Sequence, residues 1–145
     1  MLKEVLEIFD PKPGQIYIDA TVNGGGHAIA LAQRLGQRGK IIGIDWDCAL
    51  VEELRTNVLT SGVRNAEAIC DNYVNIARIA ESKKMMRKVH GVLFDLGFSS
   101  HHIEYSGRGF SFLRDEPLDM RYNAASPLTA EEIVNTWTQG AIEKM

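Results

Sequence analysis

The stretch QIYIDATVNGGGHAIALAQRL (residues 15–35) predicts the fold of the chain around it. Its first residues are β-branched, aromatic and apolar, which is typical of a short buried strand. Three glycines, Gly24 to Gly26, then end the strand pattern. After them apolar residues recur at helical spacing, at Ala28, Leu31, Ala32 and Leu35. Because a strand that passes through glycines into a helix brings backbone N–H groups close to a ligand, this junction is the first candidate for a binding site.

Strand and helix patterns alternate over the first two-thirds of the chain. We expect strands over residues 15–21, 40–46, 65–70 and 90–97, and helices over residues 2–9, after the glycines, after Asp47, and from about residue 73 to 85 or 86. Asp47 is the expected N-cap of its helix. This order predicts right-handed βαβ units in an open, mostly parallel sheet with helices on both faces, a Rossmann-like α/β architecture. Ligands of such sheets lie beyond the carboxyl ends of the strands.

Residues 98–128 show neither the helical nor the strand spacing of apolar residues. Glycines and prolines punctuate them, and a loop of this length inside a compact domain is often functional. A helical pattern returns at TAEEIVNTW (residues 129–137), where Thr129 and Glu132 have capping-box spacing and Ile133, Val134 and Trp137 form an apolar face. Four strands leave the sheet with an unfinished edge, so we expect the sequence to be incomplete at its C-terminus.

The composition fits an ordinary globular protein of one domain. The 145 residues carry a net charge of -3, so no overall basic field marks a nucleic-acid-binding protein, although a local patch would suffice. No apolar run approaches the roughly 18 residues of a membrane span.

Cys48 and Cys70 lack CxxC spacing, and we expect packed or idle thiols in a reducing compartment. No ligand set for a metal is present, so no metal is expected.

Two classes of ligand use a glycine turn of this kind. A dinucleotide places its pyrophosphate there and requires G-x-G-x-x-G, but Ile29 stands at the third glycine position. S-adenosylmethionine has no phosphate, and its ammonium and sulfonium groups favour nearby acids. Asp19, late in the first strand, suits that ligand and would repel a pyrophosphate. The glycines can also be purely structural.

Two further acids follow strands at the same edge of the predicted sheet. Asp45 ends the second strand and can accept hydrogen bonds from both ribose hydroxyls, as in NAD and S-adenosylmethionine sites alike. Asp95 ends the fourth strand and would point into the same crevice. The plainer alternatives are an N-cap for Asp45, a cap or surface residue for His27, and a solvated loop pair for His101 and His102.

The segment SGRGFSFLRDEPLDMRYN (residues 106–123) mixes arginines with aromatic residues. Arg108 and Arg121 can hold phosphates, and Phe110 can stack on an unpaired base. Composition alone favours a simpler alternative, in which the aromatic residues anchor the loop and the arginines pair with Asp115, Glu116 and Asp119.

Five motifs in this order resemble those of the MraW/RsmH family of S-adenosylmethionine-dependent rRNA methyltransferases: TVNGGGH (21–27), GIDWD (43–47), GVLFDLGFSS (91–100), GRGFSF (107–112) and EPLDMRYN (116–123). The resemblance covers nearly the whole chain, and RGFSF followed by PLDMR is its most specific part. It implies a class I methyltransferase that modifies the N4 amine of a cytidine in small-subunit ribosomal RNA, free or in the assembled small subunit. It also implies the cytoplasm for a bacterial protein, the mitochondrial matrix for a eukaryotic one, and no membrane.

The resemblance also implies a division of the chain. Residues 1–97 would form the N-terminal part of the methyltransferase domain, and residues 98–145 a long functional loop with the start of a helical substrate-recognition insert. Family members are about twice as long, so the chain looks truncated.

The family's functional residues can be assigned to the positions of this sequence that match its motifs. Gly25, Gly26 and His27 would contact the cofactor, Asp45 would hold its ribose, and Tyr73 would lie beside its adenine. Asp95 would lie near the methionine end and the target amine, which makes it the candidate catalytic residue. His102 would contact the cofactor from a position where the family commonly has glutamine, and Asn23 stands where glycine is usual. Arg108, Phe110 and Arg121 would bind substrate.

Two other functions stay open. The first is a truncated, catalytically inactive product that binds RNA or a partner, which the missing last strands favour. The second is an NAD-dependent Rossmann enzyme, which the failed glycine fingerprint and the acid at Asp19 disfavour.

Overall fold

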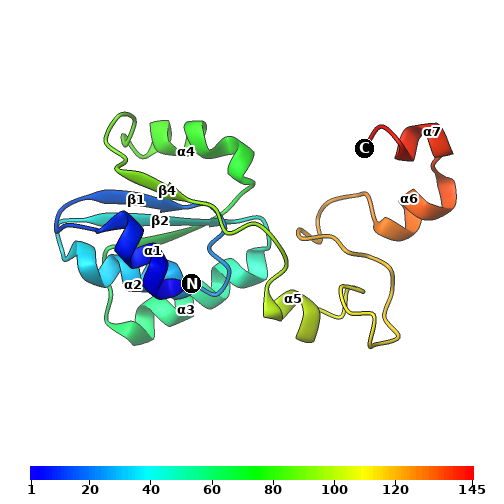
Figure 1. Ribbon diagram of the computed structural model, residues 1–145, viewed down its shortest axis with the longest axis horizontal. Helices are drawn as coiled ribbons and strands as arrows, with labels where there is room; N and C mark the ends of the chain where they lie inside the picture. Colours follow the sequence, from blue (N-terminus) through cyan, green and yellow to red (C-terminus); the bar gives the residue numbers. More distant parts are fainter. The chain divides into compact units, whose positions relative to one another are not determined.

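The computed structural model describes all 145 residues. The chain forms two compact units, unit 1 from Met1 to Leu96 and unit 2 from Gly97 to Met145 (Figure 1). Each unit has its own secondary structure. None of the helices is both long enough and apolar enough to cross a membrane.

Unit 1 contains a parallel sheet of four strands in the order β3-β2-β1-β4. The strands are β1 (Ile16–Asp19), β2 (Lys40–Asp45), β3 (Ala66–Cys70) and β4 (Gly91–Leu93). Asp19 lies opposite Gly43 on one side and Leu93 on the other, and Asp45 lies opposite Cys70. All four carboxyl ends therefore meet at one edge of the sheet, as the sequence predicts.

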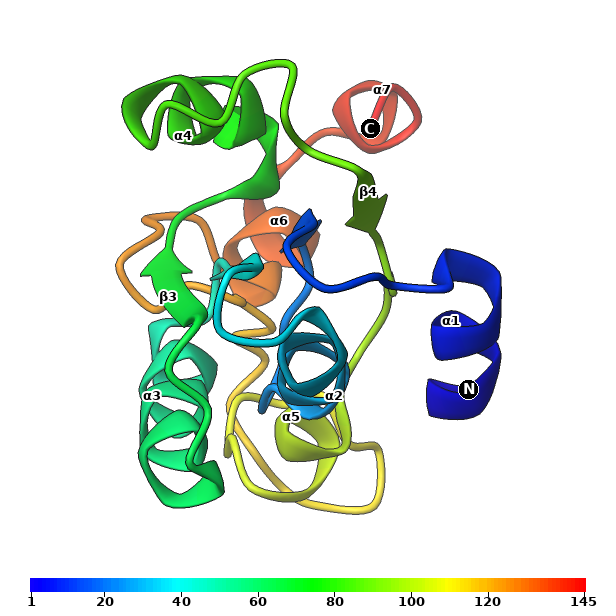
Figure 2. The ribbon, with the colours of Figure 1, turned by 90° about the vertical axis from the view of Figure 1, so that its left-hand side faces the viewer.

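Helices cover both faces of this sheet (Figures 1 and 2). On one face lie α1 (Leu2–Phe9), α2 (Gly26–Leu35) and α3 (Cys48–Ser61), and on the other lies α4 (Ile76–Ser82). The four apolar positions predicted for α2 are all buried, and they pack with Tyr17, Ile41 and Leu54 in one core cluster. The second cluster joins Ile18, Ile42 and Ile44 of the strands to Ile79 and Met85. This confirms the predicted Rossmann-like α/β arrangement of unit 1.

Three elements of unit 1 are clearly shorter than the sequence predicts, and the first is β1, which was expected over residues 15–21 and spans Ile16–Asp19. The helix expected from residue 73 begins as a 3-10 turn, η1 (Tyr73–Asn75), and α4 ends at Ser82. It ends because the Met85 amide returns to the Ala80 carbonyl (2.8 Å), which buries Met85 in the core. β4 ends at Leu93 because the chain then leaves the sheet, and the Asp95 amide donates to the Thr21 hydroxyl instead of to a strand.

Unit 2 contains three short helices, α5 (Ser100–Glu104), α6 (Ala130–Thr136) and α7 (Gln139–Ile142). The prediction of no regular structure before residue 128 was wrong at α5, which is too short to show a period and is held by a reciprocal cap between Ser99 and His102. The Thr129 hydroxyl accepts the Glu132 amide (3.1 Å), as predicted for the start of α6. No residue of α6 is buried, however, so its predicted apolar face is not a core face here.

An aromatic cluster and two arginines hold the long loop of unit 2. The rings of Phe98, His102, Phe110 and Tyr122 have centroids between 4.8 and 6.1 Å apart. The Arg108 guanidinium donates to the Arg121 and Tyr122 carbonyls (2.7 and 2.8 Å). Arg121 forms a two-pronged ion pair with Asp119 (2.8 and 2.7 Å), and its hydrogen bonds lower the pKa of that carboxyl. The aromatic residues and arginines therefore build the loop, as the simpler alternative predicts.

Candidate cofactor-binding site

The glycine turn between β1 and α2 requires backbone that other residues rarely adopt. Gly25 is the N-cap of α2 and has a φ of +91°, and a Cβ atom there would overlap the Leu54 side chain. Asn23 has a φ of +48°, a left-handed conformation that asparagine tolerates better than most residues and glycine adopts freely. This explains why glycine suits that position. Gly26, the first residue of α2, has open space around its missing side chain.

Asp45, at the end of β2, organises the turns on both sides of it. One carboxylate oxygen accepts the Asn23 amide and the other accepts the Asp47 amide, both at 2.9 Å. Asp47 in turn accepts the Ala49 amide (3.0 Å) and caps α3, as predicted. Because a carboxylate offers about four acceptor positions, these two bonds are compatible with further bonds to ribose hydroxyls. Asp45 thus fixes the glycine turn and the start of α3 around one carboxylate.

Asp19, the last residue of β1, is a fully buried acid. One oxygen accepts the Thr21 amide (3.3 Å), while the other, Oδ2, has no hydrogen-bond partner. The pKa of Asp19 is raised to about 7, chiefly by burial; the Thr21 amide lowers it, and the negative charges of Asp45 and Asp95 add to the increase. The three carboxylates are therefore close enough to influence one another. Such a cluster of negative charge favours a cationic ligand.

Thr21 connects the ends of β1 and β4. Its amide donates to Asp19, and its hydroxyl accepts the Asp95 amide (2.7 Å). The chain therefore fixes the backbone position of Asp95, the candidate catalytic residue, from a residue 74 positions away. Asn57 of α3 similarly donates to the Gly24 carbonyl (2.9 Å) and braces the glycine turn. Sequence patterns missed both residues, because a single Thr or Asn carries no periodic signal.

Tyr73 lies just past the end of β3, at the same edge. Its ring meets that of Phe94 edge to face, with centroids 5.7 Å apart, and the residue remains 41% exposed. Phe94 directly precedes Asp95 in the chain. An exposed aromatic face beside the acids suits a planar ligand group such as adenine.

A family model describes the same chain from end to end: the MraW methylase family model matches residues 1–145. The chain belongs to this family. The methyl donor of the MraW methylases is S-adenosylmethionine, which confirms the predicted cofactor and sets the NAD-dependent alternative aside.

Several MraW methylase relatives carry the name ribosomal RNA small subunit methyltransferase H. Those of Heliobacterium modesticaldum, Dictyoglomus thermophilum and Fervidobacterium nodosum are 37%, 40% and 41% identical to this chain and match 100%, 100% and 96% of it. The matched parts make up 46%, 48% and 47% of those proteins, so the chain spans about half the length of these relatives. TrmN from Thermus thermophilus, a solved structure, is 22% identical with a TM-score of 0.50 over 53% of this chain and 23% of that one, which shows likeness of fold alone.

The residues at this edge of the sheet fit S-adenosylmethionine on chemical grounds. Gly25, Gly26, His27, Asp45, Tyr73 and Asp95 all lie at the carboxyl edge of the unit 1 sheet. The buried, unpartnered Oδ2 of Asp19 adds a carboxylate for which a cationic ligand is a natural counterion. This edge of the sheet therefore combines exposed backbone, an aromatic face and clustered negative charge.

Unit 2 contains the other residues that were predicted to bind cofactor or substrate: His102, Arg108, Phe110 and Arg121. The His102 ring nitrogen Nδ1 lies 2.7 Å from the Ser99 hydroxyl, and the ring packs against Tyr122 and Phe110. Arg108 lies over the Phe110 ring at 5.8 Å. These contacts describe how unit 2 holds the four residues, and their roles toward cofactor and substrate stay predictions.

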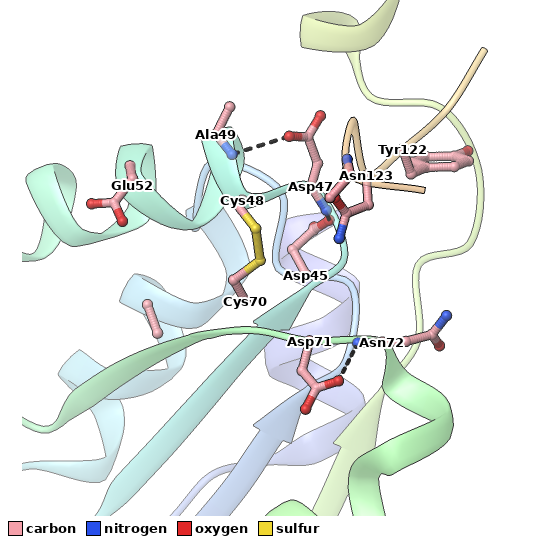
Figure 3. The surroundings of a disulfide bond; sticks show 12 residues. Asp45, Asp47, Cys48, Ala49, Glu52, Cys70, Asp71, Asn72, Tyr122 and Asn123 are labelled. Carbon is pink, nitrogen blue, oxygen red and sulfur yellow. Dashed lines mark hydrogen bonds between the residues drawn. A yellow bond between two sulfur atoms is a disulfide. The ribbon is translucent and has the colours of Figure 1, made fainter. Parts of the chain in front are cut away.

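The prediction that Cys48 and Cys70 are packed or idle thiols was wrong. Cys48 and Cys70 form a disulfide bond, with Cα atoms 5.1 Å apart (Figure 3). The bond was missed because the two residues are 22 positions apart and have no motif spacing. The crossover from β2 through α3 to β3 brings them together beside Asp45.

Proposed function

We propose that the protein takes part in methyl transfer from S-adenosylmethionine to the N4 amine of a cytidine in small-subunit ribosomal RNA. The observation that supports this most directly is the gathering of Asp19, Asp45 and Asp95 around one glycine turn. The names of the relatives support ribosomal RNA as the substrate class. Because these relatives are bacterial, the proposed place of action is the bacterial cytoplasm.

The residues of unit 1 divide the task of holding the cofactor. The backbone of Gly25, Gly26 and His27 lines the turn, and Asp45 accepts the ribose hydroxyls. Tyr73 offers its exposed face to the adenine, as aromatic residues do for nucleobases. Asp19 and Asp95 supply negative charge at the cationic end.

The bound cofactor supplies a methyl group on a positively charged sulfur. The attacking N4 amine is a weak nucleophile because its lone pair is delocalised into the cytosine ring. Asp95 accepts a hydrogen bond from this amine, which helps localise the lone pair on nitrogen. Alignment of the reacting groups contributes the larger share of the lowering of the activation barrier, for which intramolecular models allow about 7–11 kcal/mol.

The loop of unit 2 is the proposed contact for RNA. Arg108 and Arg121 meet phosphates, Phe110 stacks on an unpaired base, and His102 contributes to the cofactor contact. The base must leave its stack to reach the crevice, at a cost of about a few kcal/mol, which stacking and phosphate contacts partly offset.

The test uses S-adenosylmethionine with a labelled methyl group and small-subunit ribosomal RNA, free and assembled. Digestion of the RNA to nucleosides should give labelled N4-methylcytidine. The competing candidate is a protein that binds the cofactor and RNA without turnover. Cofactor and RNA binding without label transfer would support that candidate, and absence of cofactor binding would contradict both.

Asp45→Ala is expected to weaken binding of S-adenosylmethionine by about tenfold to a hundredfold, because it removes a charged acceptor of two ribose hydrogen bonds. Titration calorimetry measures this change. Glu52→Ala is the matched control, since it removes one negative charge from an exposed position on α3. Because Asp45 also holds two backbone amides, both variants are compared below their melting temperatures. Equal affinity of Asp45→Ala and wild type would remove the ribose assignment.

Tyr73→Ala is expected to weaken cofactor binding by about tenfold, since stacking on a base contributes about 1–3 kcal/mol. Tyr73→Phe keeps the ring and should bind as wild type does. The same titration measures both variants. Loss of affinity in Tyr73→Phe as well would show that the hydroxyl, and not the aromatic face, makes the contact.

A further inference from the structure

The disulfide bond of unit 1 closes around the turn that carries Asp45. Cys48 is the first residue of α3 and follows Asp47, whose amide donates to the Asp45 carboxylate (2.9 Å). Cys70 is the last residue of β3 and the register partner of Asp45, and the next amide, that of Asp71, donates to the Asp45 carbonyl (3.0 Å). Figure 3 shows Asp45 beside the bond and Asp71 next along the chain from Cys70. The cross-link therefore joins the two chain segments that flank Asp45.

The two cysteines have each other as their only possible partner within the chain. The sequence contains two cysteines in all. Cys48 is an exposed residue and Cys70 is half-buried, so a small thiol or disulfide in solution can reach the pair. The start of a helix also stabilises a thiolate, which favours exchange at Cys48.

We propose that Cys48 and Cys70 form a reversible disulfide that sets how tightly the crevice of unit 1 holds its cofactor. This rests on the proposed function for the identity of that cofactor. With the bond in place, the segment from Asp45 to Cys48 is tied to the end of β3. With the bond broken, hydrogen bonds and the packing of α3 hold the segment without a covalent link to β3, and the cofactor must complete its ordering on binding. Pre-ordered sites bind more tightly, so the oxidised form should have the higher affinity.

The exchange chemistry needs a low-molecular-weight disulfide as oxidant. The Cys48 thiolate attacks one sulfur of that disulfide, forming a mixed disulfide and releasing the first thiolate. The Cys70 thiolate then attacks the Cys48 sulfur and releases the second. The two cysteine thiols are oxidised, the small disulfide is reduced to two thiols, and the two cysteine protons end on those thiols. A dithiol runs the same steps in reverse.

The coupling must be reciprocal. If the oxidised form binds the cofactor more tightly by some factor, the cofactor must make the disulfide harder to reduce by the same factor. We expect a factor of about 3–10, the range that ordering of a short turn supplies. The oxidised form should also show slower hydrogen exchange at the amides of residues 47–49, with or without cofactor.

The experiment compares three samples: protein oxidised with glutathione disulfide, protein reduced with dithiothreitol, and the variant Cys48→Ser/Cys70→Ser in both buffers. Alkylation and intact mass count the free thiols. Calorimetry with S-adenosylmethionine measures affinity, and hydrogen exchange measures the turn. The expected result is no alkylation and about 3–10-fold tighter binding in the oxidised sample, with the variant matching the reduced protein in either buffer.

Three results would overturn the proposal: two alkylated cysteines after oxidation, equal affinity of the two forms, or weaker binding by the oxidised form. In all of these the cofactor still binds, so the proposed function survives. Failure of every sample to bind, the variant included, would instead contradict the proposed function and this regulation with it, and the exchange data would still report whether the bond holds the turn.

Discussion

Relative to the wild-type protein, Asp19→Asn is expected to gain about 4 kcal/mol in its free energy of unfolding between pH 4 and pH 8. Any further difference between the two proteins should not depend on pH. The reason is the buried carboxyl, whose pKa is about 7 in the folded chain against 3.8 for the ordinary group. Between these pH values the folded state holds a proton that the unfolded state has lost. The free energy of unfolding therefore falls by about 1.4 kcal/mol per pH unit over this window and levels off above it. Asparagine cannot ionise, so the variant lacks this fall.

Denaturant unfolding at a series of pH values measures the difference between variant and wild type. Asp115→Asn, at an exposed position of unit 2, is the control and should show no pH-dependent difference from wild type of this size. A constant difference between Asp19→Asn and wild type from pH 4 to pH 8 would mean that Asp19 is not the destabilising acid. If the expected pH-dependent difference is found, the stability lost through the buried acid is a consequence of function, since a cationic cofactor beside it favours the charged form.

Gly25→Ala is expected to destabilise the protein by about 2–5 kcal/mol. Its left-handed backbone disfavours any residue with a Cβ atom by about 1–2 kcal/mol. The added methyl group would also overlap Leu54, which is fully buried and cannot move aside without disturbing the core, at a further cost of about 1–3 kcal/mol. Thermal or denaturant unfolding measures the loss.

Gly26→Ala provides the contrast one residue later. A Cβ atom there meets nothing within 4 Å, and alanine favours a helix over glycine, so stability should stay within about 0.5 kcal/mol of wild type or rise. If Gly26 contacts the cofactor, this variant keeps its fold and loses affinity. Equal destabilisation by both alanines would contradict the geometry described for the turn.

Local signals in the sequence predicted much of unit 1. The spacing of Leu31 and Leu35 marked the buried face of α2, and Asp47 was recognisable as a cap because caps act within three residues. Asp45 was predicted at the end of its strand because a strand boundary is also a local property. The predicted ends of α4 and β4 lay beyond the observed ends at Ser82 and Leu93, since core packing of Met85 and the hydrogen bond between Asp95 and Thr21 set them.

The sequence by itself determined the order of strands and helices in unit 1, the face that α2 buries, and the meeting of three acids at one edge, because periodicity and parallel connection fix these properties. The tertiary structure alone decided which distant residues touch. It paired Thr21 with Asp95, joined Cys48 to Cys70 and left one oxygen of Asp19 without a partner. Such contacts depend on strand register and on the path of each crossover, which no short stretch of sequence encodes.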